Sequence, residues 1–471
     1  MKKIAIIGGG AAGTATLWAL SKTQHQVILF EAESYLGGHA YTHQLEIDGK
    51  QVCVDMGVEY FHERLSPNLT AMLKEFNIET YIAPLSFRAF NKHEPEKIYW
   101  SNSQIGGDLK HRFHGEMNRF HLDMLAMMEE GNLYYRGMSI REFLVKKNYT
   151  REFQQQVLLP LMTTFSGCNA PSLDYSLMYV ALSFNMNLLS FFSPSHWRKT
   201  SGGIHQYFKK IHRLLSEKIH LNCPVESVQK MKQGIEVVLK NKNTIIVDEV
   251  IFACQAEIAN RLLKNSSQFQ HSLLGSFEYV NVQSVLHSDT AAVSGKPLSH
   301  EYCQFELADE VRNDFPGFLT RVNHHLYPYQ SLSTPLYVSF DHLEEINPAE
   351  ILSIKNWKLP KLRPEDLTRK SKIRNIQGQD NYWFCGTDYS LTGHEGALVS
   401  GLVIAHRLGA DYRFEDNWLA KAQFDTIKNF MGVYSRQDKW LEKLDTLLFT
   451  RAKRFNLHQR LANRYIQELL F

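Results

Sequence analysis

The sequence predicts an α/β fold that begins with a strand–helix–strand unit, and three observations near the start of the chain support this. Residues 4–7 form an apolar, β-branched run typical of a buried parallel strand. Helical residues 14–20 and a second apolar strand, 26–30, follow in turn. Between the first strand and the helix, three glycines stand in the spacing G-x-G-x-x-G: Gly8, Gly10 and Gly13. This order predicts a Rossmann-like unit with a parallel sheet and a dinucleotide site.

The residues of this unit suit a ligand that carries a pyrophosphate. Glycine has no Cβ, so the turn lets the backbone approach a pyrophosphate, and the N–H groups at the helix start, around Ala12, face its charge. The second strand leads into Glu31, where a carboxylate can accept hydrogen bonds from an adenosine ribose. A glycine-rich turn without a ligand is the alternative, but it does not explain why the strand, the helix and the acidic residue follow one another at this spacing.

The composition is that of an ordinary globular chain. At 471 residues it is long enough for two or three domains, with 44% hydrophobic and 21% charged residues. The 52 basic and 49 acidic residues give a net charge of +3, so no strong field favours a nucleic acid partner. Six scattered cysteines without a C-x-x-C pair suit a reducing cytoplasm better than a disulfide framework or a metal site.

Two apolar stretches raise the question of export or membrane insertion. Lys2 and Lys3 before an apolar run imitate a signal peptide, but the glycine cluster interrupts the run, so we expect a cytoplasmic protein. Residues 175–195 carry no charge and have nearly the length of a membrane span. Their serines and asparagines are costly in lipid, so a buried helix lining a cavity is favoured over a transmembrane helix.

A second glycine pair, Gly37 and Gly38, follows Glu31. The glycine turn, the acid and this pair resemble the first FAD-binding motif of the flavin amine oxidase and FAD-dependent desaturase superfamily. The resemblance implies bound FAD, with the pair near its pyrophosphate and flavin end. Most members have Arg after the pair, whereas His39 makes this chain similar to a bacterial NAD/FAD-binding oxidoreductase branch with a GGH motif. Noncovalent flavin is the default expectation, with attachment through His39 as the alternative.

Later segments resemble further parts of the superfamily's FAD site. Residues 55–61 match the segment that passes the flavin ring, where Gly57 lets the backbone approach the isoalloxazine. Residues 219–228 match a strand near the adenine, which the Val225 backbone contacts. Residues 382–405 match the C-terminal motif, whose helix N–H groups stabilise negative charge at flavin N1–C2=O. From this motif the resemblance implies six further FAD contacts: Gly386, Thr387, Asp388, Gly396, Ala397 and Leu398.

The resemblance also implies a domain organisation. It predicts a glutathione-reductase-type FAD-binding domain made of three segments: 1–82, 197–260 and 378–411. The inserted α+β substrate domain comprises 83–196 and 261–377, and a helical C-terminal tail comprises 412–471. Within the substrate domain, residues 116–130 repeat methionines and other apolar residues at helical spacing, which fits a core face or an adaptable apolar pocket.

The end of the chain is basic and carries leucines at helical spacing. Residues 436–471 contain eight basic and four acidic residues. Two interpretations stay open. The tail can lie as an amphipathic helix on the anionic inner face of a membrane. It can instead pack on the body of the protein or on a second copy of the chain, which would then form a homodimer.

No motif for hydrolysis or phosphoryl transfer occurs: the sequence has no nucleophile elbow, H-E-x-x-H or Walker loop. Three polar residues beside the implied flavin are the candidates for catalysis: His394, Glu395 and His62. Each can accept a proton from an amine or alcohol, and each can equally be a structural hydrogen-bonding residue. Lys199 invites comparison with the flavin-proximal lysine of many amine oxidases, but it belongs to a different segment, so no role is carried over.

The resemblance implies an amine-oxidase-like, FAD-dependent oxidoreductase. Such an enzyme moves a hydride from a small hydrophobic or amine substrate to flavin N5, and O₂ or another acceptor re-oxidises the flavin. Two alternatives remain. One is an FAD-dependent desaturase of acyl or polyene chains, which the apolar middle and the basic tail suit. The other is a flavin-binding protein without turnover.

Overall fold

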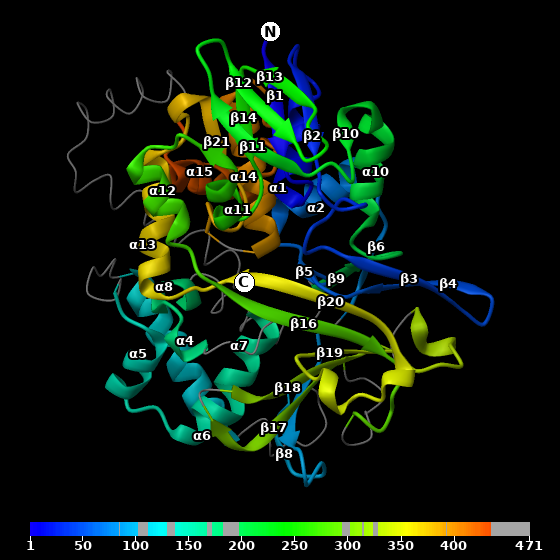
Figure 1. The fold of residues 1–471 in the computed structure, drawn as a ribbon. Coiled ribbons are helices and arrows are strands. Elements are labelled where there is room, and N and C mark those ends of the chain that lie inside the picture. Colours follow the sequence, from blue (N-terminus) through cyan, green and yellow to red (C-terminus); the bar gives the residue numbers. More distant parts are fainter. Residues whose placement is uncertain are drawn as a thin grey trace.

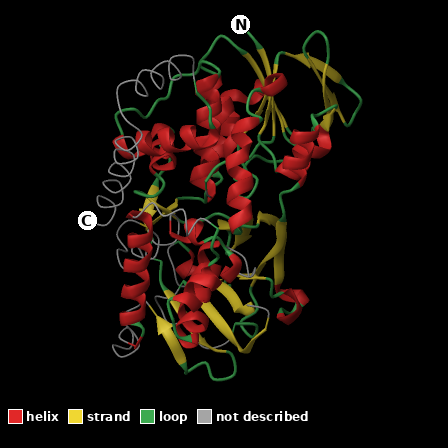
Figure 2. Ribbon diagram, turned by 90° about the vertical axis from the view of Figure 1, so that its left-hand side faces the viewer, coloured by secondary structure: helices red, strands yellow, loops and turns green. Residues whose placement is uncertain are grey.

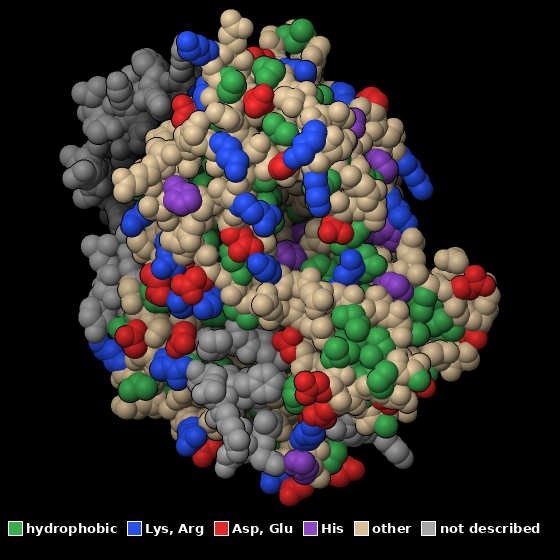
Figure 3. Space-filling model, viewed as in Figure 1, with side chains coloured by type: hydrophobic (Ala, Val, Ile, Leu, Met, Phe, Trp, Pro, Cys, Tyr) green, Lys and Arg blue, Asp and Glu red, His purple; other side chains and the backbone are tan. Residues whose placement is uncertain are grey.

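The computed structural model describes most of the chain. The described residues are 1–83, 85–101, 112–129, 137–166, 172–181, 197–293, 302–312, 315–323, 328–391 and 393–434. They form two stacked halves, with a parallel sheet in the upper half and a larger mixed sheet in the lower half (Figure 1). Helices pack beside both sheets (Figure 2). Charged side chains of both signs are interspersed over the face seen in Figure 3, in keeping with the small net charge.

The parallel sheet has the strand order β10-β2-β1-β14-β21. Its strands are β1 (Lys3–Ile7), β2 (Gln26–Phe30), β10 (Ile219–His220), β14 (Glu249–Phe252) and β21 (Tyr382–Phe384). The central strand β1 is buried from Ile4 to Ile7, as an apolar strand covered on both faces should be. Helix α1 (Ala11–Leu20) follows it directly. The predicted strand–helix–strand opening is therefore confirmed.

Helix α14 (Gly393–Arg407) packs closely against α1 beside this sheet. A Cβ at Gly401 would overlap the Ala12 carbonyl, and the Thr16 hydroxyl donates to the Gly401 carbonyl at 3.1 Å. Only glycine permits this approach, which holds the first and last cofactor motifs of the sequence side by side.

Three smaller sheets occur besides the parallel sheet and the large mixed sheet. One is the hairpin of β3 (Thr42–Ile47) and β4 (Lys50–Asp55), whose turn residues Asp48 and Gly49 both have positive φ, as a two-residue hairpin turn requires. A four-stranded sheet contains β11 (Val225–Lys230), β12 (Ile235–Leu239), β13 (Thr244–Val247) and β15 (Leu263–Lys264). A three-stranded sheet contains β5 (Phe61–His62), β6 (Thr80–Ile82) and β9 (Trp197–Thr200). Consecutive strands form antiparallel hairpins, among them β3 with β4 and β12 with β13.

The lower half is organised on a seven-stranded sheet of order β20-β16-β19-β18-β17-β7-β8. Its strands are β7 (Phe87–Asn91), β8 (Ile98–Ser101), β16 (Tyr279–His287), β17 (Cys303–Arg312), β18 (Phe315–Val322), β19 (Tyr337–Phe340) and β20 (Ile351–Pro360). Only the pair of β7 and β17 is parallel. The sheet therefore combines strands from two separate segments of the chain, 87–101 and 279–360, and strands β9 to β14 lie between these segments in the sequence.

The remaining main helices are α2 (Pro67–Glu75), α4 (His114–Glu129), α5 (Ile140–Lys146), α6 (Arg151–Phe153), α7 (Leu159–Ser166), α8 (Leu177–Tyr179), α10 (Gln206–Leu215), α11 (Ala256–Leu262), α12 (Gln268–Gly275), α13 (Pro364–Lys372) and α15 (Trp418–Met431). The predicted methionine-bearing helix is confirmed as α4, which buries Met117, Phe120 and Met124 in the core. No helix among the described residues is long and apolar enough to cross a membrane. Of the predicted helix 175–195, the structure describes residues 175–181, which contain the short helix α8; residues 182–195 lie outside the described part, as do 435–471 of the predicted tail.

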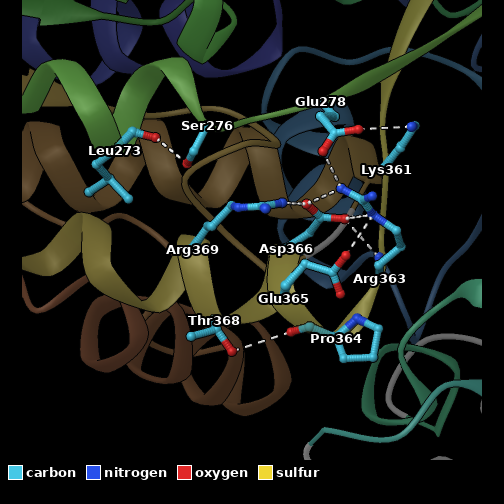
Figure 4. Close-up of polar contacts among 10 residues, drawn as sticks. All are labelled: Leu273, Ser276, Glu278, Lys361, Arg363, Pro364, Glu365, Asp366, Thr368 and Arg369. Carbon is cyan, nitrogen blue, oxygen red and sulfur yellow. Dashed lines mark hydrogen bonds and ion pairs between the residues drawn. The ribbon is translucent and has the colours of Figure 1, made fainter.

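An ion-pair cluster joins the start of α13 to the segment that leads into β16 (Figure 4). Arg363 Nη2 and Lys361 Nζ contact the two oxygens of Glu278 at 2.7 and 2.9 Å. These hydrogen bonds lower the pKa of Glu278 to about 2. Arg363 also pairs with the buried Asp366, one turn into the helix. The cluster fixes the helix that carries Lys370 toward the site described next.

Candidate active site

A cavity of about 1780 Å³ is lined by residues of both halves of the molecule. Its nucleotide end lies at the carboxyl ends of β1 and β2, where ligands bind in parallel α/β sheets. Its apolar end is lined by Leu85, Tyr175, Tyr179 and Trp197. The sequence-predicted residues that line it are Gly8, Gly10, Ala12, Glu31, Gly37, Gly38, His39, Gly57, His62, Val225, Gly386, Thr387, Asp388, His394, Glu395, Gly396 and Ala397. Of the predicted residues, Gly13 and Leu398 are not among those that line it.

The glycine turn leaves room for a ligand beside the backbone. Gly8 has a φ of +110°, and a Cβ there would lie 2.6 Å from the Ala253 carbonyl oxygen. A Cβ at Gly13 would overlap the Gly8 carbonyl oxygen, so this glycine closes the turn on itself. By contrast, a Cβ at Gly10 would meet no described protein atom within 4 Å. Gly10 therefore faces open space at the first turn of α1, where a pyrophosphate is expected.

Glu31 holds the loop around this turn. Its Oε2 accepts a hydrogen bond from the Gly9 amide at 2.5 Å, and its Oε1 accepts from the Glu33 amide at 2.8 Å. Burial raises the pKa of Glu31, and these amide hydrogen bonds oppose the shift. A carboxylate has about four acceptor positions, so both oxygens can still accept from ribose hydroxyls.

Asp388 presents an unpartnered oxygen at the cavity. Its Oδ2 accepts from the Ala256 amide at 2.8 Å and from the Tyr279 hydroxyl at 2.6 Å. Its Oδ1 is buried and has no hydrogen-bond partner among the described residues. Burial raises the pKa of Asp388, while the nearby ammonium of Lys370 opposes the shift. A hydroxyl-bearing ligand can satisfy such an oxygen, as the ribityl chain of FAD would.

Lys370 reaches the same part of the cavity from α13. Its Nζ donates to the Thr387 carbonyl at 2.7 Å. Burial lowers the pKa of this ammonium to about 8, with Asp388 and Asp366 opposing the shift.

The start of α14 closes this part of the cavity. Gly396 and Ala397 lie on its first turns, and both line the cavity. The Ser400 hydroxyl accepts from the Gly386 amide at 2.8 Å and donates to the Ala397 carbonyl at 2.6 Å, which locks β21 to the helix. A helix N-terminus favours negative charge. Open space at the glycines, two acceptor carboxylates and this helix start together fit FAD.

The three predicted catalytic candidates lie at the cavity with different surroundings. His394 Nε2 is 2.8 Å from the Tyr207 hydroxyl, and burial lowers the pKa of His394 to about 4, which keeps the ring neutral. Glu395 accepts from the amides of Asn68 and Leu69 at 2.7 and 2.9 Å, so it caps helix α2. Burial raises the pKa of Glu395 to about 7. His62 is buried with its ring edge-on to Trp197, at 5.4 Å between centroids.

A buried charge cluster next to Gly57 was not predicted from the sequence. Glu59 forms ion pairs with Lys199 through Oε1 and with Arg321 Nη1 through Oε2, the latter at 3.2 Å. The Tyr302 hydroxyl donates to the same Oε2. Arg321 Nη1 also donates to the Gly57 carbonyl at 3.0 Å. Glu59 stands two residues after the predicted flavin-edge glycine, which is the one local hint, whereas nothing in the sequence connects it to Arg321.

Among the described residues outside the cavity, one group resembles a metal site. Ligand atoms of Glu306, His342 and Glu345 lie within 4.8 Å of one another. The Lys92 ammonium already lies 2.6 Å from Glu345 and 3.6 Å from Glu306. Lys92 therefore supplies the positive charge at this place.

Fold and site together define a dinucleotide-binding α/β protein whose cavity fits FAD and continues into an apolar chamber. The model of the flavin containing amine oxidoreductase family matches residues 12–293. The chain belongs to this family, and its cofactor is FAD.

Curated relatives agree with this membership. An L-amino-acid oxidase of Pseudechis australis is 22% identical over 284 residues, and that of Demansia vestigiata is 20% identical over 290 residues. Each match covers 55% of this chain and 52% of the relative. The chain thus spans about half the length of the curated relatives it matches.

Solved structures show the same fold over most of the chain. Wild-type putrescine oxidase bound to putrescine has a TM-score of 0.65 at 16% identity, covering 86% of this chain and 98% of that chain. A fatty acid isomerase from P. acnes that produces CLA has a TM-score of 0.68 at 13% identity, covering 87% and 99%. Cyclohexylamine oxidase from Brevibacterium oxydans has a TM-score of 0.64 at 14% identity, covering 86% and 99%. Such low identity shows the fold alone.

Proposed function

We propose that this chain is an FAD-dependent oxidoreductase that takes a hydride from a small hydrophobic or amine substrate. One observation carries the proposal: a single cavity joins the glycine turn and the start of α14 to a chamber lined by apolar and aromatic side chains. A cofactor laid along the first part would present its reactive end to a substrate in the second part. The names of the L-amino-acid, putrescine and cyclohexylamine oxidases support the same class of chemistry.

Bound FAD would supply the hydride acceptor. The residues of the chain would hold and orient the cofactor and the substrate. We assign pyrophosphate binding to the α1 turn, ribose binding to Glu31, and ribityl binding to the unpartnered Oδ1 of Asp388. The amides at Ala397 and Leu398 would face negative charge as it builds on the flavin. The apolar end excludes water from the substrate.

His394 is the proposed proton acceptor at the start of α14. Its low pKa keeps it neutral, and the Tyr207 hydroxyl fixes its ring. Glu395 is the weaker candidate, because both its oxygens already accept amide hydrogen bonds. We assign to Glu395 a structural role that joins α14 to α2.

A second candidate is a desaturase of acyl or polyene chains. The apolar lining of the chamber favours it, and the fatty acid isomerase shares the fold. The chemistry at the cofactor would be the same, with a C–C bond in place of a C–N bond as the site of oxidation.

Spectroscopy of the purified holoprotein tests the proposal. We expect flavin absorption bands that bleach under anaerobic conditions with at least one member of a panel of amines, alcohols and acyl compounds. Hydrogen peroxide on admission of air, with amines, supports the oxidase. Bleaching by acyl compounds alone supports the desaturase. A purified protein without flavin bands, or bands that no compound bleaches while dithionite does, contradicts the proposal.

A further inference from the structure

The charge cluster at Glu59 contains more positive than negative charge. One carboxylate, Glu59, faces two cations, Lys199 and Arg321, and all three side chains are buried or nearly so, at 1%, 3% and 13% exposure. A buried charge without a counter-charge is costly, so an excess cation in such a place calls for an anion. The excess belongs to Arg321, because Lys199 shares the carboxylate and does not line the cavity, whereas Arg321 does.

A further carboxylate that interacts with the cluster, Asp55, does not provide the missing charge. Asp55 accepts hydrogen bonds from the Thr42 hydroxyl and the Ile204 amide, and it is not among the residues lining the cavity. Burial and the neighbouring Glu59 raise the pKa of Asp55 to about 7, so its carboxyl is partly neutral near pH 7. The Cys303 thiol beside Arg321 is neutral as well, since burial raises its pKa to about 12.

The aromatic rings at the cluster are already occupied by a cation of the chain. The Lys199 ammonium lies 5.2 Å from the ring centroid of Tyr60, 5.3 Å from that of Tyr302 and 5.5 Å from that of Tyr329. Such a cage would otherwise suit the ammonium of an amine substrate. Lys199 fills the cage, and a second ammonium brought beside Arg321 would be repelled.

Arg321 has hydrogen-bonding capacity left. Its Nη1 is used by the Gly57 carbonyl and by Glu59. Its guanidinium carbon lies 4.7 Å from the ring centroid of Phe340, also a cavity residue. No hydrogen bond of its Nε or Nη2 to a described residue is present, and a guanidinium has five N–H donors in a fork that matches a carboxylate.

We propose that the cavity takes a substrate with a carboxylate on an apolar body, and that the Arg321 guanidinium binds the carboxylate. This inference rests on the proposed function, because it names the substrate class of the same cavity. Arg321 lies against Gly57, at the boundary between the cofactor segments and the aromatic lining. The bound acid therefore has its charged end near the boundary and its apolar body among the rings. Two sources share this chemistry: a simple carboxylic acid, and an α-amino acid whose amino group points away from Arg321 or is bound neutral.

Titration calorimetry on the wild-type holoprotein at pH 7 tests the preference directly. The probes are 4-phenylbutanoate, 4-phenylbutan-1-ol and 4-phenylbutan-1-amine, which have the same apolar body and differ in charge. We expect the acid to bind at least tenfold more tightly than the alcohol, and the amine to bind more weakly than the alcohol. Equal affinities, or tightest binding of the amine, overturn the inference.

The variant Arg321→Gln tests whether Arg321 causes the preference for the acid. We expect it to lose at least tenfold in affinity for the acid and to keep the alcohol affinity within threefold. The matched control is Arg198→Gln, which removes an arginine paired with Glu63 at 2.7 Å on β9, outside the cavity lining. The control should bind the acid as the wild type does. Unchanged acid binding in Arg321→Gln overturns the inference.

Arg321→Lys keeps the charge and removes the planar fork, and it serves if the glutamine variant does not fold. We expect it to bind the acid three- to tenfold more weakly than the wild type. Anaerobic flavin bleaching with 2-amino-4-phenylbutanoate and with 4-phenylbutanoate then separates the two sources of the carboxylate.

Because calorimetry reads binding and not turnover, the inference and the proposed function fail in different ways. Acid binding without bleaching by any compound supports the inference and contradicts the hydride transfer. Flavin bleaching by amines, together with no preference for the acid in calorimetry, supports the hydride transfer and contradicts the inference about carboxylate binding.

Discussion

The two ends of the cavity are formed by different kinds of groups. The proposed nucleotide end is formed mainly by backbone: glycines that leave space, amides at helix starts, and carboxylates held by amides. The apolar end is lined by side chains, many of them aromatic, and the buried charges of Glu59, Lys199 and Arg321 lie beside it, with Lys199 behind the cavity wall. The comparison teaches that the first end depends on local chain geometry, whereas the second depends on charge balance between distant segments.

The substitution expected to disrupt the nucleotide end most is Gly13→Ala. A single methyl group there would overlap the Gly8 carbonyl oxygen, which is backbone and cannot move without opening the turn. We expect the purified variant to carry less than a tenth of the wild-type flavin per chain, measured by the ratio of flavin to protein absorbance.

Gly115→Ala is the matched control for this substitution. Gly115 also lies in a helix, α4, and a Cβ there meets no described atom within 4 Å. We expect full flavin content and a gain of at most about 0.5 kcal/mol in the free energy of unfolding, since alanine favours helix over glycine and Gly115 lies in the first turn, where the preference is weaker than in the interior. A Gly13→Ala variant with stoichiometric flavin would show that the turn is not closed as described.

This contrast explains which features could be predicted from the sequence. The opening strand, helix and strand were predictable because G-x-G-x-x-G and its flanking runs are contiguous, and the turn chemistry is local. The 45–54 hairpin was predictable for the same reason, from alternation around Asp48 and Gly49. The order of the seven-stranded sheet was not predictable, because β7 pairs with β17 across more than two hundred residues.

The site divides in the same way. Gly8, Gly10, Glu31 and Asp388 were predicted to surround one ligand, and the structure places them around one cavity. Their contacts with FAD remain predictions. The Glu59 cluster was missed because its three charges come from β9, β18 and the segment before β5, and no periodicity records such a meeting. A resemblance to a family supplies motifs that bind the shared cofactor, and it says little about residues that select a substrate.

The next largest effect should come from Glu59→Gln, which breaks the charge balance of the apolar end. The amide cannot neutralise Lys199 and Arg321, so two buried cations lose their carboxylate. Removing one partner of a buried ion pair costs about 3–5 kcal/mol. We expect a loss of this size in the free energy of unfolding by urea, measured on the holoprotein.

Glu63→Gln provides the comparison within the same segment. Glu63 pairs with Arg198, and the two side chains are 29% and 26% exposed, so the pair should contribute only about 0–1 kcal/mol. Equal losses in the two variants would mean that burial at Glu59 carries no special cost, and the charge argument for the apolar end would fall.

The smallest effect concerns Glu395, a cavity residue that caps α2, and it is read from pH dependence. Burial raises the pKa of Glu395 from 4.5 to about 7. Between these values the native state holds a proton that the unfolded chain releases, so stability is fully present below pH 4.5 and is lost as pH rises through 7. The shift corresponds to about 3 kcal/mol. Asp55, whose pKa is also raised to about 7, contributes in the same direction.

Glu395→Gln should therefore flatten, and not abolish, the fall in stability between pH 5 and pH 8. At pH 5 the variant lacks the titrating carboxyl, and one amide of α2 loses its acceptor, so the wild type is the more stable protein. Toward pH 8 the ionised, buried carboxylate destabilises the wild type. The difference in free energy of unfolding between the wild type and the variant should therefore narrow by about 3 kcal/mol. Urea unfolding at four pH values measures the gap, and Glu152→Gln, at an exposed position, should keep the wild-type profile. A gap that stays constant with pH would mean that Glu395 is ionised throughout, so that the two amides, and not burial, set its state.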